Sequence, residues 1–365
     1  MKILFYFSHP AQYLFLRETI KRLKKENIHQ VHILIKTKDV LEKLISSDKL
    51  EFENILPKER GNSKLEIALS LFNRIIKISP IVRRVKPDLL IGTDASITHL
   101  SFLFRKKCIT ITEDDFEIIK TLGRLAYPFT STILCPKVCK VGKWDDKKIG
   151  YSGYMKLGYL HPNVFSPSRE VLNNYSFPEN YVLIRLAKLT AHHDFGIKGI
   201  DYNFLDKIIT LFESKNLRVY ISSEGEILDD YKKYLLDINP SDIHHVLAYS
   251  KLFICDSQSM SVEASMLGVP SIRYSSFAGK ISVLEELEKK YKLTFGVPIG
   301  NEDMLFDKIY NLINLENLSE VFQERRQKML NDTIDVSKFM TWFIGNYPES
   351  NRIMKKDNNY QNKFK

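Results

Sequence analysis

The sequence has few of the features that mark several large classes of protein. It contains only four cysteines in 365 residues, too few for the disulfide framework of a small secreted scaffold. Cys135 and Cys139 have no second cysteine pair or histidine pair at zinc-ligand spacing, so we expect buried thiols and no metal. There is also no Asp-x-Asp array of the kind that holds a catalytic metal ion. The sequence therefore predicts neither a metal nor a bound cofactor.

Long apolar runs are missing as well. The apolar start Ile3–Phe7 ends at Ser8, short of the about 7 to 15 residues in the core of a signal peptide. No stretch approaches the about 20 apolar residues that cross a bilayer. With 44% hydrophobic and 27% charged residues, the composition is that of an ordinary globular protein, and we predict a cytoplasmic one.

The charge balance is basic, with a formal net charge of +10. The basic residues come in short clusters, such as Arg83-Arg84 and Arg105-Lys106-Lys107, without any helix-turn-helix, zinc-finger or aromatic RNA-binding signature. We therefore predict no nucleic-acid partner. A phosphate-rich substrate and peripheral contact with an anionic inner membrane surface are both compatible with this charge.

Short apolar segments alternate with segments of helical periodicity along the chain. In the first half, we expect strands at 3–7, 31–35, 88–92 and 108–112, and helices at 13–25, 40–45 and 67–85. Such a β-α alternation predicts a parallel sheet covered by helices. The proline-rich stretch 161–180 is typical of an interdomain connection, and the alternation restarts after it.

The length suits two domains of this kind. We predict an N-terminal Rossmann-like domain at 1–165, which would bind the acceptor, and a C-terminal Rossmann-like domain at 166–335, which would bind a nucleotide sugar. Residues 336–365 would form a C-terminal helix and a basic tail, frayed from Met354 onward.

The most informative segment is Asp256–Pro270, which follows the apolar strand 252–255. Ser257 and Ser259 would lie at a helix start, where unpaired N–H groups favour an anion. Glu263 lies one turn further on, where a carboxylate can accept hydrogen bonds from ribose hydroxyls. The alternative is that a serine only caps the helix.

This segment resembles the donor-binding motif of the GT-B superfamily, which includes glycosyltransferases and non-hydrolysing UDP-N-acetylglucosamine 2-epimerases. In the epimerases a strand ends in Asp-Ser-Gly-Gly, and a Glu seven residues after the Asp contacts ribose. Asp256 and Glu263 keep this spacing, whereas Gln258-Ser259 replaces the two glycines. The Glu-x7-Glu motif of retaining transferases is not matched. The resemblance implies an α/β GT-B-like fold, with two Rossmann-like domains whose parallel sheets face each other across a cleft.

A second resemblance extends over nearly the whole chain. The chain is similar to a prokaryotic family called domain of unknown function three-five-four, which is grouped with the GT-B superfamily and is often found in surface-polysaccharide settings. The motifs that carry this likeness are Ser8-His9-Pro10-Ala11, Tyr151-Ser-Gly-Tyr154, Tyr159-Leu-His-Pro-Asn163, His193-Asp194-x-Gly196, Ile221-Ser-Ser-Glu-Gly225 and Asp256-Ser-Gln-Ser-Met260.

Candidate catalytic residues follow the strands of the first half. His9 precedes Pro10 directly after the first strand, and inverting transferases of this fold often carry their base in this loop. Asp94, Glu113 and Asp114 follow two further strands and could orient or replace that base. The alternative for His9 is a hydrogen bond within its own turn.

Candidate donor-binding residues follow the strands of the second half, where cations and imidazoles suit a diphosphate. Arg273 could equally form a salt bridge, and His244 could cap a helix. The predicted set is Arg185, Lys188, His193, Ser222, Ser223, Glu224, His244, Ser257, Gln258, Ser259, Met260, Glu263 and Arg273.

These predictions combine into one function with two alternatives. The first is an inverting, metal-independent glycosyltransferase that moves a sugar from a nucleotide diphospho-sugar to a surface-polysaccharide or lipid-linked acceptor. The second is a non-hydrolysing UDP-sugar 2-epimerase, in which Glu113, Asp114 and His193 would supply acid and base groups at the C2 of the sugar. The third is a non-catalytic protein that binds sugar nucleotides.

Overall fold

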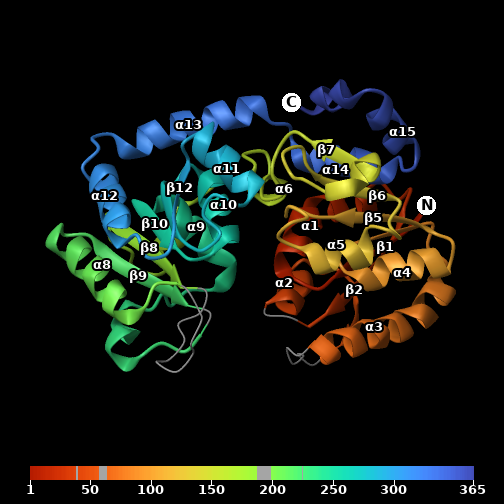
Figure 1. The fold of residues 1–365 in the computed structure, drawn as a ribbon, viewed down its shortest axis with the longest axis horizontal. Coiled ribbons are helices and arrows are strands. Elements are labelled where there is room, and N and C mark those ends of the chain that lie inside the picture. The colour runs from red at the N-terminus through yellow and green to blue at the C-terminus, as the bar shows by residue number, and fades with distance from the viewer. Residues whose placement is uncertain (38–39, 57–63, 187–198, 224) are drawn as a thin grey trace. The chain divides into compact units, whose positions relative to one another are not determined.

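The computed structural model describes residues 1–37, 40–56, 64–186, 199–223 and 225–365. Contacts divide the chain into two compact units. Unit 1 contains residues 1–164 together with 332–365, and unit 2 contains residues 165–331. Each unit is a parallel sheet covered by helices (Figure 1).

Unit 1 contains a seven-stranded sheet in the order β3-β2-β1-β4-β5-β6-β7, with every neighbouring pair parallel. Its strands are β1 (Lys2–Phe7), β2 (Gln30–Lys36), β3 (Glu53–Leu56), β4 (Leu89–Gly92), β5 (Lys107–Ile111), β6 (Thr132–Pro136) and β7 (Lys148–Tyr151). Strands β1, β4 and β5 are nearly all apolar because both of their faces are covered.

The helices of unit 1 connect these strands. They are α1 (Pro10–Lys25), α2 (Leu41–Ser47), α3 (Lys64–Val85), α4 (Ala95–Leu103), α5 (Lys120–Ala126), the 3₁₀ helix η1 (Gly142–Lys147) and α6 (Leu157–Leu160). Helix α1 begins three residues before the predicted start at residue 13. His9 caps it and Pro10 occupies its first position, where the missing N–H of proline costs nothing.

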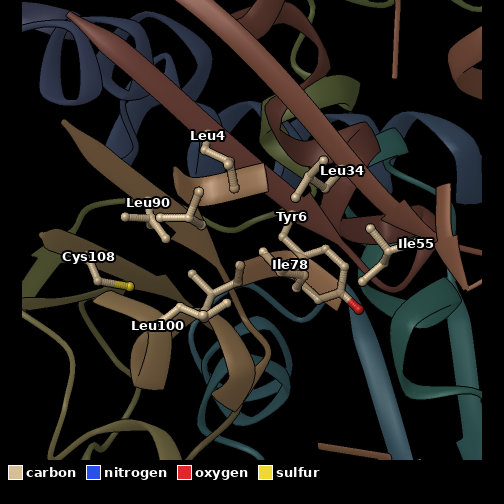
Figure 2. Packing of buried hydrophobic residues seen from close by; sticks show 10 residues of the cluster. Leu4, Tyr6, Leu34, Ile55, Ile78, Leu90, Leu100 and Cys108 are labelled. Atoms are coloured by element: carbon tan, nitrogen blue, oxygen red, sulfur yellow. The ribbon is translucent and has the colours of Figure 1, made fainter. Parts of the chain in front are cut away.

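One layer of the unit 1 core lies between the sheet and helices α3 and α4. Figure 2 shows Leu4, Tyr6 and Leu90 of the sheet packed against Ile78 and Leu100 of these helices, and all five residues are fully buried. Burial of this kind contributes roughly 1.5 to 3 kcal/mol per large apolar side chain. The core therefore holds β1 and β4 firmly side by side.

The C-terminal residues return to unit 1 as α14 (Val336–Gly345), α15 (Glu349–Lys356) and the 3₁₀ helix η4 (Asn358–Phe364). The prediction of a frayed tail from Met354 was wrong. Met354 is buried, and the rings of Tyr360 and Phe364 pack on Trp342 with centroid distances of 4.8 and 5.4 Å. Apolar side chains spaced among the lysines anchor the tail.

Unit 2 contains a five-stranded parallel sheet in the order β12-β11-β10-β8-β9. Its strands are β8 (Tyr181–Leu186), β9 (Arg218–Ser223), β10 (Leu252–Cys255), β11 (Ser271–Tyr274) and β12 (Thr294–Val297). Its helices are α7 (Arg169–Asn173), α8 (Tyr202–Ser214), η2 (Asp229–Tyr234), η3 (Pro240–Asp242), α9 (Ile243–Tyr249), α10 (Gln258–Leu267), α11 (Ser282–Lys289), α12 (Glu302–Ile313) and α13 (Leu318–Asp332), which ends at the boundary with unit 1. Over the described ranges, no helix is both long and apolar enough to span a bilayer.

Candidate functional site

The four predicted catalytic residues gather at one edge of the unit 1 sheet. Strands β1, β4 and β5 are direct neighbours, and their carboxyl ends lie side by side. His9 follows β1, Asp94 follows β4, and Glu113 and Asp114 follow β5. The carboxyl edge is where parallel α/β sheets bind their ligands.

His9 caps helix α1. Its Nδ1 accepts a hydrogen bond from the backbone N–H of Ala11 at 3.1 Å. A neutral imidazole whose Nδ1 accepts carries its proton on Nε2, so in this orientation the ring donates from Nε2. The ring must therefore leave its capping position before His9 can take a proton.

Asp94 caps helix α4 and is held from a second side by a buried arginine. Its Oδ1 accepts from the N–H of Ser96 at 2.8 Å and from Nε of Arg74 at 3.2 Å. Arg74 also donates to the hydroxyl of Ser70 at 2.6 Å. Asp94 is thus an ionised, fixed carboxylate, suited to positioning other groups.

Glu113 lies in a buried setting at the end of β5. Its Oε1 accepts from the N–H of Met155 at 2.5 Å, and Oε2 lies 3.4 Å from Nζ of Lys156. Burial raises the pKa of the Glu113 carboxyl, while the nearby charge of Lys156 partly opposes that rise. Asp114 is exposed beside it. Glu113 thus has the environment of a general acid or base working closer to neutral pH.

Lys156 was not predicted from the sequence. It is 4% exposed and faces Glu113, although lysine is almost never buried without a partner. It lies two residues after Tyr154, which ends one of the family-like motifs. The unusual position of a lysine just before the apolar helix α6 (Leu157–Leu160) was the available signal.

In unit 2, the carboxyl ends of β9, β8 and β10 are neighbours. Arg185 and Ser222 are register partners on β8 and β9, and Nη1 of Arg185 donates to the hydroxyl of Ser222 at 2.5 Å. Ser223 forms a local turn, in which its hydroxyl accepts from the N–H of Gly225 at 3.2 Å. A guanidinium and a hydroxyl therefore lie together at this edge.

Helix α10 begins at the carboxyl end of β10. Ser257 caps it, accepting from the N–H of Met260 at 3.5 Å, as the capping alternative proposed. Ser259 and Met260 are half-buried in its first turn. Gln258 is fixed from two sides, because its amide donates to Ser275 at 2.7 Å and accepts from Arg273 at 3.3 Å. The first turn of α10 is thus rigid and presents its N–H end at the sheet edge.

Two predicted donor-binding residues from different helices meet in unit 2. Nε2 of His244, on α9, lies 3.4 Å from Oε2 of Glu263, on α10. Glu263 is 7% exposed, so its carboxylate needs a partner of this kind. The ring of Phe165, which the sequence reasoning did not single out, lies 6.0 Å from the ring of His244.

Arg273 does not lie where the prediction of a donor contact would place it. Its side chain is fully buried and forms an ion pair with Glu288 at 3.0 Å. The salt-bridge alternative is therefore the observed one, since no surface of Arg273 is left for a ligand. Arg273 instead holds the amide of Gln258. The predicted residues Lys188, His193 and Glu224 lie outside the described residues.

Known structures share this fold over nearly their whole length. The chain is similar to a Staphylococcus aureus MnaA–UDP complex, with 13% identity, a TM-score of 0.70 and 96% of each chain covered. A Neisseria meningitidis UDP-GlcNAc 2-epimerase bound to UDP-GlcNAc gives 13% identity and a TM-score of 0.65, covering 96% of this chain and all of that chain. The spinosyn forosaminyltransferase SpnP gives 12% identity and a TM-score of 0.57, covering 92% of this chain and 96% of that one.

At these identities, the likeness establishes the fold. The fold is GT-B-like. No family model matches the chain, and no curated protein does. The similarity to the family of domain of unknown function three-five-four therefore stays a prediction.

Proposed function

We propose that this protein acts on a nucleotide diphospho-sugar and binds the nucleotide on unit 2. The observation that carries the proposal is the junction of β10 and α10. There, an N–H-rich helix start and the buried Glu263–His244 pair lie within one helix of each other. A diphosphate suits the helix start, and ribose hydroxyls suit the carboxylate. Similar structures that contain UDP or UDP-GlcNAc support this assignment.

The reaction that we propose first is inverting glycosyl transfer without a metal ion. A base takes the proton of an acceptor hydroxyl, whose oxygen attacks the anomeric carbon while the bond to the diphosphate breaks. Arg185 and the first turn of α10 would meet the charge of the departing diphosphate. Glu113, or His9 once it leaves its capping position, would be the base. A surface-polysaccharide or lipid-linked glycan would be the acceptor.

A second reaction, epimerisation at C2 of the sugar, is favoured by a specific observation. Such a reaction needs a group that removes and returns a proton on carbon, and a buried carboxyl with a raised pKa is suited to this work. Glu113 has that environment. Several of the similar structures are UDP-GlcNAc 2-epimerases.

One experiment tests binding and separates the two reactions. A thermal-shift screen against a panel of nucleotide sugars should show one that raises the unfolding temperature, since a ligand of the native state stabilises it by mass action. The stabilising sugar nucleotide is then incubated with the protein alone, with and without EDTA. An epimer that appears without an acceptor would replace transfer by epimerisation. No stabilisation by any nucleotide sugar would refute the shared proposal.

A further inference from the structure

Helices α3, α4 and α5 of unit 1 present an apolar surface that nothing in unit 1 covers. Six large apolar side chains on these helices and the loop after α5 are 37% to 68% exposed. They are Phe72, Ile76, Phe102, Leu103, Leu125 and Phe129, which we call the α3–α5 patch. Exposed apolar side chains gathered on adjacent elements mark a binding surface, whereas scattered ones do not.

The patch is continuous across its three helices. Helix α3 packs on α4, and α4 packs on α5. The rings of Phe102 and Phe129 lie 5.3 Å apart, and His99 bridges them by stacking on Phe129 at 4.7 Å and bonding the carbonyl of Leu125. Figure 1 shows α3 and α4 side by side at the outside of unit 1. The aromatic side chains are therefore fixed in place while exposed.

The charges around the patch have almost a single sign. Residues 70–88, 95–107 and 120–131 contain ten basic residues and one acidic residue, Asp88, which accepts from the N–H of Lys2. The exposed cations gather after the C-terminal ends of the helices, as with Lys86 after α3 and with Arg105 and Lys107 after α4. Parallel β-α-β connections bring these ends to the amino edge of the sheet, away from the carboxyl edge that carries His9 and Glu113.

We propose that the α3–α5 patch docks unit 1 on the surface of an anionic lipid bilayer. Aromatic and aliphatic side chains would enter the interfacial layer, and the surrounding cations would meet lipid phosphates. A second copy of this chain is a poor occupant, since two such faces would bring like charges together. Nucleic acid would match the charge and leave the exposed phenylalanines without an apolar partner.

The test measures sedimentation of the full chain with lipid vesicles. We expect binding to phosphatidylcholine vesicles that contain about one third phosphatidylglycerol, and little binding to phosphatidylcholine alone. Replacing three cations (Arg105→Gln, Lys106→Gln, Lys107→Gln) should weaken the partition coefficient by about 100-fold, at about fivefold for each cation. The apolar variant Phe102→Ser with Leu103→Ser should weaken it by about tenfold.

A matched control exists in unit 2. The exposed residues Lys289, Lys290 and Lys292 form a similar basic cluster, and their replacement by Gln should leave vesicle binding unchanged. Thermal unfolding checks that all variants are folded. Nucleotide-sugar stabilisation, a property assigned to unit 2, should persist in every variant, so this proposal and the proposed function fail separately.

Three outcomes would overturn the proposal. The first is a wild-type chain that does not sediment with anionic vesicles. The second is a patch variant that binds them as the wild type does. The third is wild-type self-association that the patch variants abolish, because the patch would then be a protein interface.

Discussion

Glu263 and His244 illustrate what a single pair of side chains adds to the sequence pattern. The sequence indicated two separate ligand contacts, and the structure places them 3.4 Å apart. The spacing of Glu263 from Asp256 is local and legible in the chain, whereas the approach of α9 to α10 is tertiary. The pair gives the proposed ribose contact a fixed orientation.

We expect Glu263→Gln to weaken nucleotide binding by about ten- to a hundredfold, the usual cost of losing a hydrogen bond to a charged group. Isothermal titration with the sugar nucleotide found by the screen measures this. Glu320→Gln, an exposed carboxylate on α13 of the same unit, is the control and should bind normally. Equal affinities for the two variants would remove Glu263 from the site.

Glu113 gives a prediction that depends on pH. If the ionised carboxylate is the base, kcat/KM falls as the pH drops through its raised pKa. Lys156→Met removes the cation that lowers this pKa, so the acid limb of the profile should move to higher pH. Glu113→Gln should reduce kcat by about 10²- to 10⁴-fold. An acid limb that stays in place in Lys156→Met would assign it to another group.

At the scale of elements, the start of α14 depends on one buried carboxylate. Asp335 accepts from Nδ2 of Asn163 at 3.0 Å, from the hydroxyl of Ser337 at 2.8 Å and from the N–H of Lys338 at 3.0 Å. Burial alone would raise the pKa of Asp335, but these hydrogen bonds lower it to about 2. The carboxylate therefore fastens α14 to the segment after α6.

We expect Asp335→Asn to lower the free energy of unfolding by about 2 kcal/mol at neutral pH. Because the folded pKa is depressed, the stabilisation is present above the unfolded pKa of about 4 and is lost as the pH falls toward about 2. Chemical unfolding of both proteins across this range measures the difference. A difference that does not shrink on acidification would contradict the assignment.

Elements were predictable from the sequence where their burial is complete. The central strands β1, β4, β8 and β10 were predicted because covered strands are almost wholly apolar. Edge strands β3 and β12 were missed, since an edge strand buries fewer side chains and its pattern is weaker.

The candidate site was predictable only in part, and for a related reason. Strand order decides which loops meet, and it is not written in any local pattern. His9, Asp94 and Glu113 were placed after the correct strands, but their neighbourhood depends on β4 lying between β1 and β5. The burial of Arg273 and the pairing of Lys156 with Glu113 arise from packing between distant segments.

At the scale of the whole molecule, unit 1 is built from both ends of the chain. Helix α14 packs on α1, and Phe339, Met340 and Phe343 of α14 are fully buried in unit 1. Figure 1 shows the C-terminal helices beside β6 and β7. The last residues are therefore part of the core of the first unit.

We expect truncation after Asn331 to unfold unit 1 while unit 2 stays folded. Removal of three fully buried large side chains costs about 2 to 5 kcal/mol each, comparable in sum with the stability of a domain. Hydrogen exchange should show lost protection in β1 and β6, with β8 and β10 of unit 2 as the internal control. Full protection of β1 in the truncated chain would refute the prediction.

The return of the chain to unit 1 also sets an order of events during synthesis. Residues 165–331 form one uninterrupted stretch, so unit 2 can complete its core as soon as that stretch leaves the ribosome. Unit 1 is translated first and finished last, because β1 and α1 wait for α14. A ribosome stalled near Asn331 should therefore carry a folded second unit and an incomplete first one, so the half that bears His9 and Glu113 matures only at the end of synthesis.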